Sequence, residues 1–347
     1  MNRSSIKVAA AKFLCNTGID RVFRSSSVPV VLAYHRVVED FVSTSAISSP
    51  SMLVSLQMLE KHLDWIGRRY RFVDLDELGA RLESGDSSGS VAALTFDDGY
   101  RDFYQLALPM LQRKGIPAAI FVVTDYIGTS RVPIHDKLYL LLKRRRRALP
   151  QFAEMPGLSH MEPYTALRAM LELLPLNVVQ SIADALEAEE PLPEECTTPF
   201  HSLSWEELER VHRAGITVGS HTRTHVLMPN ETRSRVMEEA AGSREILQQR
   251  LGGAPVRHFA YPSGVFDSVS LRAVAAAGYR FAYATTPRRN AAHPLLTIPR
   301  AVLWEKSCVG SQSVFSGPVL DCQIHHAFDV FAEGYRQPNA FRQENGR

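Results

Sequence analysis

The chain has 347 residues, with 39 lysine and arginine residues against 37 aspartate and glutamate residues, so its formal net charge is only +2. This near-neutral balance does not favour nucleic acid as a partner. Hydrophobic residues make up 45% and charged residues 22%, which argues against disorder and fits a soluble globular protein of one large α/β domain or two small ones.

Residues 1–27 are expected to form a helical extension ahead of the main domain. Their apolar stretch, residues 8–14, is short and interrupted by Lys12, so it matches a secretory signal poorly. No run approaches the roughly 20 apolar residues of a membrane span. We therefore expect a cytoplasmic protein whose amphipathic N-terminal helix could contact a membrane surface. The sequence does not indicate an oligomeric state.

Strands and helices are predicted to alternate up to residue 123. The run 28–34 is short, continuous and β-branched, as in a buried parallel strand, and it ends at His35. Helices are expected at about 51–69, 74–82 and 101–114, and further strands at 91–96 and 117–123. This order predicts a parallel sheet with crossover helices.

The same order resumes after residue 200. Ser204 and Glu207 form a capping-box pattern for a helix that ends before Gly215. Further helices are expected at 231–251 and 268–277, and strands at 216–219, 257–261 and 281–285.

The segment of about 126–200 breaks this alternation, because it is helical, charged and punctuated by prolines. We interpret it as an insertion within one domain, residues 28–316, since sheet-like segments lie on both sides. Residues 317–347 show few apolar periodicities and are expected to form a loosely packed tail.

Chemically active residue types follow several predicted strands. His35, Asp97 with Asp98, and His221 with His225 all come directly after an apolar run. Ligands and catalysis collect at the carboxyl edge of parallel sheets, so these residues are expected to converge.

Two adjacent carboxylates, Asp97 and Asp98, repel each other unless a cation or another partner relieves them. One could bind a metal while its neighbour acts on the reacting water. The structural alternative is an Asp-Asp-Gly turn in which Asp98 caps helix 101–114, and the dipeptide alone leaves the two readings about equal.

His221 and His225 have a spacing that, on a helical turn, places both imidazoles on one face. With 12 histidines in the chain, about 0.4 such pairs are expected by chance, so the position after a strand carries the argument. The four cysteines form no CxxC pair, so a cysteine zinc site is not expected. Two histidines and Asp98 would leave one coordination position open for water, as catalytic zinc requires; nickel and cobalt also accept these ligands.

A hydrolytic mechanism follows from these residues. Asp97 would take the proton of the attacking water, and His35 would donate a proton to the leaving amine. Taken alone, His35 reads more readily as a core histidine bonded to the backbone.

Together, these residues resemble the polysaccharide deacetylase family, the NodB-homology domain of carbohydrate esterase family 4. Thr95-Phe96-Asp97-Asp98-Gly99 matches its first motif and His221-Thr222-Arg223-Thr224-His225 its second, and the likeness runs from Val28 to Leu303. The resemblance implies a distorted (β/α)7 barrel, Asp97 as the base, and a metal held by Asp98, His221 and His225.

The chain departs from the common family pattern in two places. Ala260 stands where an arginine often orients the base, and the usual leucine-histidine motif is absent from 296–302. A subgroup resembling exopolysaccharide poly-N-acetylglucosamine deacetylases shows the same changes and carries Tyr-His near its start, as at Tyr34-His35. His35 then becomes the implied acid, and the backbone N–H of Tyr261 the implied oxyanion donor. Our own hypothesis is that Arg300 steadies Asp97.

The expected function is metal-dependent removal of N-acetyl groups from sugars in a polysaccharide or glycolipid precursor, so the expected partner is an N-acetylated glycan or lipid-linked sugar. The alternatives are an amidohydrolase acting on a small non-sugar amide, and a non-catalytic carbohydrate-binding protein on the same scaffold. The basic run 143–147 could attract anionic lipid or a phosphate-linked sugar carrier, although a solvated helix face is the favoured reading.

Overall fold

The computed structural model describes residues 29–86, 88–144, 161–286, 289–310 and 314–327. The predicted helical extension at 1–27, residues 145–147 of the basic run and the tail beyond 327 lie outside the described residues.

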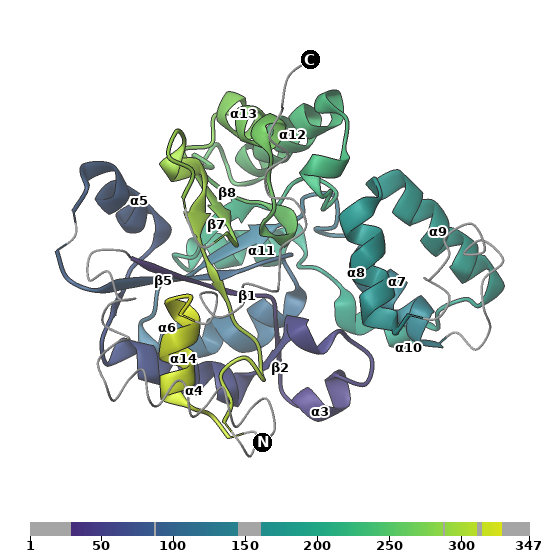
Figure 1. Ribbon diagram of the computed structural model, residues 1–347, viewed down its shortest axis with the longest axis horizontal. Coiled ribbons are helices and arrows are strands. Elements are labelled where there is room, and N and C mark those ends of the chain that lie inside the picture. Colours follow the sequence, from purple (N-terminus) through teal and green to yellow (C-terminus); the bar gives the residue numbers. More distant parts are fainter. Residues whose placement is uncertain (1–28, 87, 145–160, 287–288, 311–313, 328–347) are drawn as a thin grey trace.

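A parallel sheet forms the centre of the molecule (Figure 1), and all its strand pairs among the described residues are parallel. Its consecutive neighbours are β10, β9, β8, β7, β6, β5, β1 and β11, and β4 also pairs with β5. The strands of this sheet are β1 (Val30–Tyr34), β4 (Arg71–Phe72), β5 (Val91–Phe96), β6 (Ala119–Val122), β7 (Thr217–Ser220), β8 (His258–Ala260), β9 (Phe281–Ala284), β10 (Ile298–Pro299) and β11 (Ala301–Val302).

The short segment 298–302 closes this sheet into a ring. Its first half, β10, pairs with β9, and its second half, β11, pairs with β1 at the opposite edge. Arg300 lies between the two halves. With 298–302 taken as one strand, seven strands of the described chain go around the ring, so the distorted (β/α)7 barrel is confirmed.

Alternation along the strands divides the core into two clusters. In β5, Leu94 and Phe96 face the large cluster shared with the surrounding helices. Ala93 faces a smaller cluster made of residues from strands all around the ring, which is the barrel interior. Helix α5 packs into this interior cluster through Leu75 and Leu78. Burial on both faces explains why these strands read as continuous apolar runs.

Helices cover the outside of the barrel, and several begin where the sequence predicts. Asp74 caps α5, and Ser204 with Glu207 forms the capping box of α11. The helices outside the insertion are α3 (Phe41–Thr44), α4 (Leu56–Gly67), α5 (Leu75–Ser84), α6 (Leu108–Lys114), α11 (Trp205–Arg213), α12 (Arg233–Arg250), α13 (Ser268–Ala276) and α14 (Gly317–Ile324). Short turns are η1 (Pro50–Met52), η2 (Phe103–Ala107, a π-helix), η6 (Met228–Asn230), η7 (Pro262–Gly264) and η8 (Pro294–Leu296).

The predicted helix at 51–69 is wrong over its first residues. Residues 50–52 form η1, and β3 (Leu53–Ser55) pairs in parallel with β2 (Arg36–Val38) before α4 begins. Ser55 caps α4 by accepting a hydrogen bond from the N–H of Met58. The apolar positions of β3 continue the helical pattern of α4, so periodicity alone could not separate the two elements.

Residues 126–200 contain helices and no strand in their described part. These helices are α7 (Ile134–Arg144), α8 (Pro163–Leu173), α9 (Leu176–Glu189), α10 (Glu194–Thr197) and the turn η5 (Thr198–Phe200). Helices α7, α8 and α9 share a small hydrophobic cluster of their own and lie beside the barrel in Figure 1. Lys143 and Arg144, the described part of the basic run, already contact Ala46 and Glu190.

Loose packing was expected after residue 316, but the described part of this tail forms α14 against α4. Leu320 and Cys322 are buried, and Trp65 of α4 donates a hydrogen bond to Asp321 at 3.1 Å. The apolar pattern is only one short helix long, which is why its periodicity is weak.

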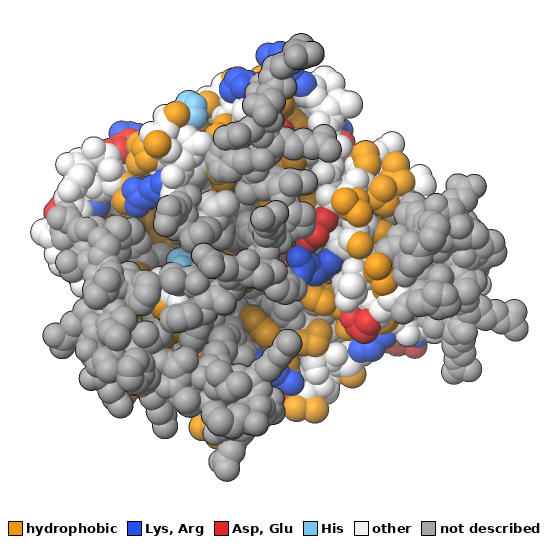
Figure 2. Space-filling view, in the orientation of Figure 1, with side chains coloured by type: hydrophobic (Ala, Val, Ile, Leu, Met, Phe, Trp, Pro, Cys, Tyr) orange, Lys and Arg blue, Asp and Glu red, His pale blue; other side chains and the backbone are white. Residues whose placement is uncertain are grey.

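None of the helices in the described ranges combines the length and apolarity needed to cross a bilayer. Figure 2 shows hydrophobic side chains on the exposed face of the helical insertion, and Leu173, at the end of α8, is 74% exposed. The cytoplasmic location stays a prediction.

Candidate functional site

The carboxyl ends of separate strands bring most of the predicted site residues together. His35 follows β1, Asp97 and Asp98 follow β5, His221 follows β7, and Arg300 lies in the closing segment. His35 is partly exposed, and the other four are at most 3% exposed.

Asp98, His221 and His225 form a buried cluster whose candidate ligand atoms all lie within 4.8 Å of one another. Oδ1 of Asp98 is 3.5 Å from Nε2 of His221 and 3.2 Å from Nε2 of His225. Within the described chain, neither oxygen of Asp98 accepts a hydrogen bond, so the alternative in which Asp98 caps the next helix is wrong. A buried, unsatisfied carboxylate facing two imidazole nitrogens is costly by itself and fits a divalent cation well.

His221 is held in the orientation that metal binding requires. Its Nδ1 donates a hydrogen bond to the carbonyl of Ala260 at 2.8 Å, which leaves the lone pair of Nε2 toward Asp98. Burial lowers the pKa of His221 to about 4, so the ring is neutral at physiological pH. Burial opposes ionisation of Asp98, but His225, followed by His135, keeps the pKa of that carboxyl well below its ordinary value.

The helical turn expected for His221 and His225 is wrong, because residues 221–225 form a loop. Thr222 has φ 70° and His225 has φ 63°, in the left-handed region that residues other than glycine rarely adopt. These two bends, rather than helical periodicity, bring the imidazoles to the same carboxylate.

Asp97 lies in a buried ion pair with Arg300. The two terminal nitrogens of Arg300 donate to the two oxygens of Asp97 at 2.7 and 2.8 Å, and one of them also donates to Thr95 at 3.2 Å. Burial would raise the pKa of the Asp97 carboxyl, but Arg300 and then His221 hold it below its ordinary value. Asp97 is therefore ionised and fixed in direction, and its oxygens retain lone pairs that can accept a proton.

His35 and Asp97 follow neighbouring positions of adjacent strands, because Tyr34 of β1 pairs in register with Phe96 of β5. Its Nδ1 has no hydrogen-bond partner among the described residues. The reading of His35 as a core histidine tied to the backbone through this nitrogen is therefore not supported.

The expected oxyanion role of the Tyr261 N–H is contradicted. That N–H donates to the carbonyl of Tyr283 at 3.1 Å, which continues the pairing of β8 with β9. The hydroxyl of Tyr261 donates to the carbonyl of Leu296, and the side chain is fully buried. Because Tyr261 continues a strand, its N–H belongs to the sheet and is not available to a reacting group.

The structure adds His135 and Asp136, which the sequence analysis missed. Nε2 of His135 lies 3.8 Å from Oδ2 of Asp98 and 2.8 Å from the hydroxyl of Tyr100, which also donates to Asp136. Burial lowers the pKa of His135 to about 3 and raises that of Asp136 to about 6. Helix α7 of the insertion thus forms one wall of the site. The sequence feature that could have revealed these two residues is a His-Asp pair on the apolar face of an amphipathic helix.

Comparison with known proteins gives a match to the family model described as polysaccharide deacetylase over residues 84–282, more than half of the chain. The matched span contains the Asp98, His221 and His225 cluster and Asp97, whereas His35 and Arg300 lie outside it.

Named relatives of this chain include two curated proteins and solved structures. YxkH of Bacillus subtilis, whose name places it with the polysaccharide deacetylases, is 21% identical over 74% of this chain and 64% of its own length. The poly-β-1,6-N-acetyl-D-glucosamine N-deacetylase of Staphylococcus epidermidis is 27% identical over 44% of this chain and 55% of its own length. The chain thus spans less than two thirds of either relative.

The structure of the Streptococcus pyogenes deacetylase PplD, solved in complex with acetate, aligns with this chain. The alignment covers 86% of this chain and 97% of the PplD chain. Its TM-score is 0.56 at 18% identity, so this likeness supports the fold.

Proposed function

Because this chain belongs to the polysaccharide deacetylase family, we propose that it hydrolyses N-acetyl groups on a polysaccharide or glycolipid precursor, releasing acetate and leaving a free amine. The observation that carries the proposal is the buried cluster of Asp98, His221 and His225 beside the Asp97 carboxylate. The name of the Staphylococcus epidermidis relative supports an N-acetylglucosamine polymer as the substrate class.

In this proposal Asp98, His221 and His225 hold a divalent cation, with zinc the first choice and nickel or cobalt also acceptable to nitrogen and oxygen ligands. When bound, such a cation supplies Lewis acidity that polarises the acetyl carbonyl and lets water lose a proton near neutral pH.

The remaining steps belong to the side chains of this protein. Asp97 accepts a proton from the attacking water as the water oxygen bonds to the carbonyl carbon. Arg300 holds both oxygens of Asp97 and so fixes the direction of the base. His35 donates a proton to the nitrogen as the carbon–nitrogen bond breaks, which gives acetate and the amine.

Acetate release from N-acetylglucosamine oligomers and lipid-linked N-acetyl sugars tests this proposal, with small linear and cyclic amides as comparison substrates. We expect acetate from at least one of the sugars. Hydrolysis of the small amides alone would replace the proposal with an amidohydrolase. Sugar binding with no hydrolysis of any substrate would replace it with a carbohydrate-binding protein.

Removing the metal should lower acetate release by about 10²–10⁴-fold, because the lost charge stabilisation is worth several kcal/mol. The measurement compares chelator-treated protein with the same sample after Zn²⁺ is restored and records metal content alongside activity. Full activity in protein without measurable metal would contradict the proposal.

Replacing His35 with alanine should lower kcat by about 10²-fold, at the lower end for a proton donor, because the partly exposed site admits water as a substitute. His293→Ala, at an exposed histidine, is the matched control. A kcat of His35→Ala within about threefold of the wild-type value would remove His35 from this role.

A further inference from the structure

The loop 221–225 has an unfavourable backbone that other parts of the protein must hold. The left-handed conformations at Thr222 and His225 each cost on the order of 1–3 kcal/mol and persist only where the surroundings fix them. The N–H of Thr222 donates to Ser220 Oγ at 3.1 Å, and the N–H of His225 donates to Thr222 Oγ1 at 2.9 Å. The loop satisfies these two donors locally.

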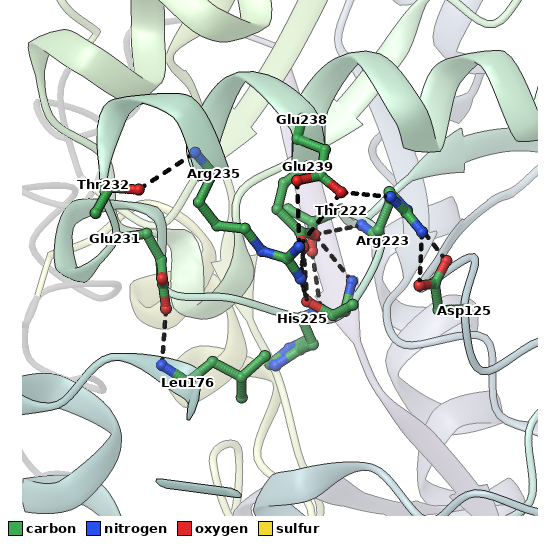
Figure 3. Close-up of polar contacts among 11 residues, drawn as sticks. Asp125, Leu176, Thr222, Arg223, His225, Glu231, Thr232, Arg235, Glu238 and Glu239 are labelled. Atoms are coloured by element: carbon green, nitrogen blue, oxygen red, sulfur yellow. Dashed lines mark hydrogen bonds and ion pairs between the residues drawn. The ribbon is translucent and has the colours of Figure 1, made fainter. Parts of the chain in front are cut away.

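The N–H of His221 continues the sheet by donating to the carbonyl of Val122 at 2.9 Å. The N–H groups of Arg223 and Thr224 are bound by one carboxylate from α12 (Figure 3). Glu239 is fully buried, and its Oε2 accepts from both N–H groups at 2.8 and 2.9 Å. Its Oε1 accepts from the hydroxyl of Thr224 at 2.7 Å and lies 2.7 Å from a terminal nitrogen of Arg235. Arg235 thus balances the charge of this buried carboxylate, and both of its oxygens accept hydrogen bonds.

Helix α12 lies close against the loop at the position of Gly242. A Cβ added at Gly242, three residues after Glu239, would lie 2.8 Å from Cδ of Arg223. The guanidinium of Arg223 also bonds Asp125, in the segment that follows β6, so the loop is held from two sides.

The two histidines of the loop differ in what orients their rings. His221 is held through Nδ1 by the carbonyl of Ala260, whereas Nδ1 of His225 has no partner among the described residues. The His225 ring packs against the rings of His135 and His221, but no hydrogen bond to Nδ1 orients it, so its direction depends mainly on its backbone. We infer that Glu239 is a positioning residue that sets metal affinity by holding the loop where His225 meets Asp98. This inference rests on the proposed metal site.

Zinc affinity of metal-free protein, measured by competition with a chromogenic chelator, tests the inference directly. Glu239→Gln should weaken Zn²⁺ binding by about 10–100-fold, as expected when a residue that orients a metal ligand is lost. Glutamine keeps the shape but turns one acceptor into a donor that faces Thr224 or Arg235. The visible absorption of the Co²⁺-loaded protein should change as well, because His225 no longer meets the ion at the same angle.

Glu238→Gln is the matched control. Glu238 is the neighbouring residue of α12 and bonds the Arg223 side chain at 2.7 Å, but it is 52% exposed and touches no backbone group of the loop. Its substitution should leave Zn²⁺ affinity unchanged. Thr224→Val removes one of the hydrogen bonds to Glu239 without a change of charge, so it should weaken zinc binding in the same direction even if Glu239→Gln folds poorly.

The outcomes separate this inference from the proposal beneath it. A purely structural role for Glu239 would lower the unfolding midpoint of the metal-free protein and leave Zn²⁺ affinity and the Co²⁺ spectrum as in the wild type, which would overturn the inference alone. If the wild-type protein binds neither ion, the metal site fails and the inference fails with it.

Discussion

Replacing Asp97 with asparagine should lower kcat for acetate release by about 10³–10⁴-fold while the metal ion stays bound. The amide keeps the shape of the side chain and can still accept a hydrogen bond from Arg300, but it cannot take a proton from water. Asp97 is 3% exposed, so bulk water cannot easily replace it as the base. The measurement is kcat together with metal content.

The same substitution one residue later is the control. Asp98→Asn removes a proposed ligand, so it should lower metal affinity, whereas Asp97→Asn should leave it nearly unchanged. The same substitution at two adjacent aspartates should therefore affect metal affinity differently, with a loss only at Asp98. If Asp97→Asn lost its metal, or kept more than about a tenth of its activity, the base role of Asp97 would be wrong.

The barrel and the convergence of the site could be predicted because both follow from local patterns. The run that forms β5 is apolar throughout and stops at Asp97, and parallel strands place their carboxyl ends at one edge. Arg300 could be suggested by its position, but its bidentate contact with Asp97 depends on how the closing segment crosses from β9 to β1.

Other parts of the site could not be predicted, because they depend on contacts between distant elements. His135 lies close to Asp98 because α7 packs against the barrel. It does not directly follow a strand, so the rule that located the other site residues could not find it. Glu239 lies among charged residues of α12 and looks like a surface residue until the helix is docked. The π-helical turn Phe103–Ala107 lies just before Pro109, which fits the first turn of α6 but not the interior of one continuous helix over 101–114. The predicted continuous helix was therefore too simple.

Replacing Arg300 with alanine should lower the free energy of unfolding by about 3–5 kcal/mol, the usual cost of leaving one partner of a buried ion pair alone. Arg300 is 2% exposed and donates to both oxygens of Asp97, so no water can take its place without rearrangement. Urea unfolding at neutral pH measures the loss. Arg257→Ala is the control, because its ion pair with Asp76 is exposed and should be worth less than about 1 kcal/mol.

The pH dependence of that loss identifies its cause. The pKa of Asp97 in the folded protein lies below its ordinary value, so the pair stabilises the fold at neutral pH, and this contribution disappears as the pH falls through the folded pKa. Without Arg300, burial acts against the charge of Asp97, so the variant should protonate there at higher pH than the wild type. The difference in stability should therefore shrink on acidification, and a difference that is constant with pH would mean lost packing instead. The double variant Asp97→Asn with Arg300→Met has no unpaired buried charge. It should recover most of the lost stability but remain inactive. That combination would show that the chain keeps the buried pair for the direction of the base and not for the stability of the barrel.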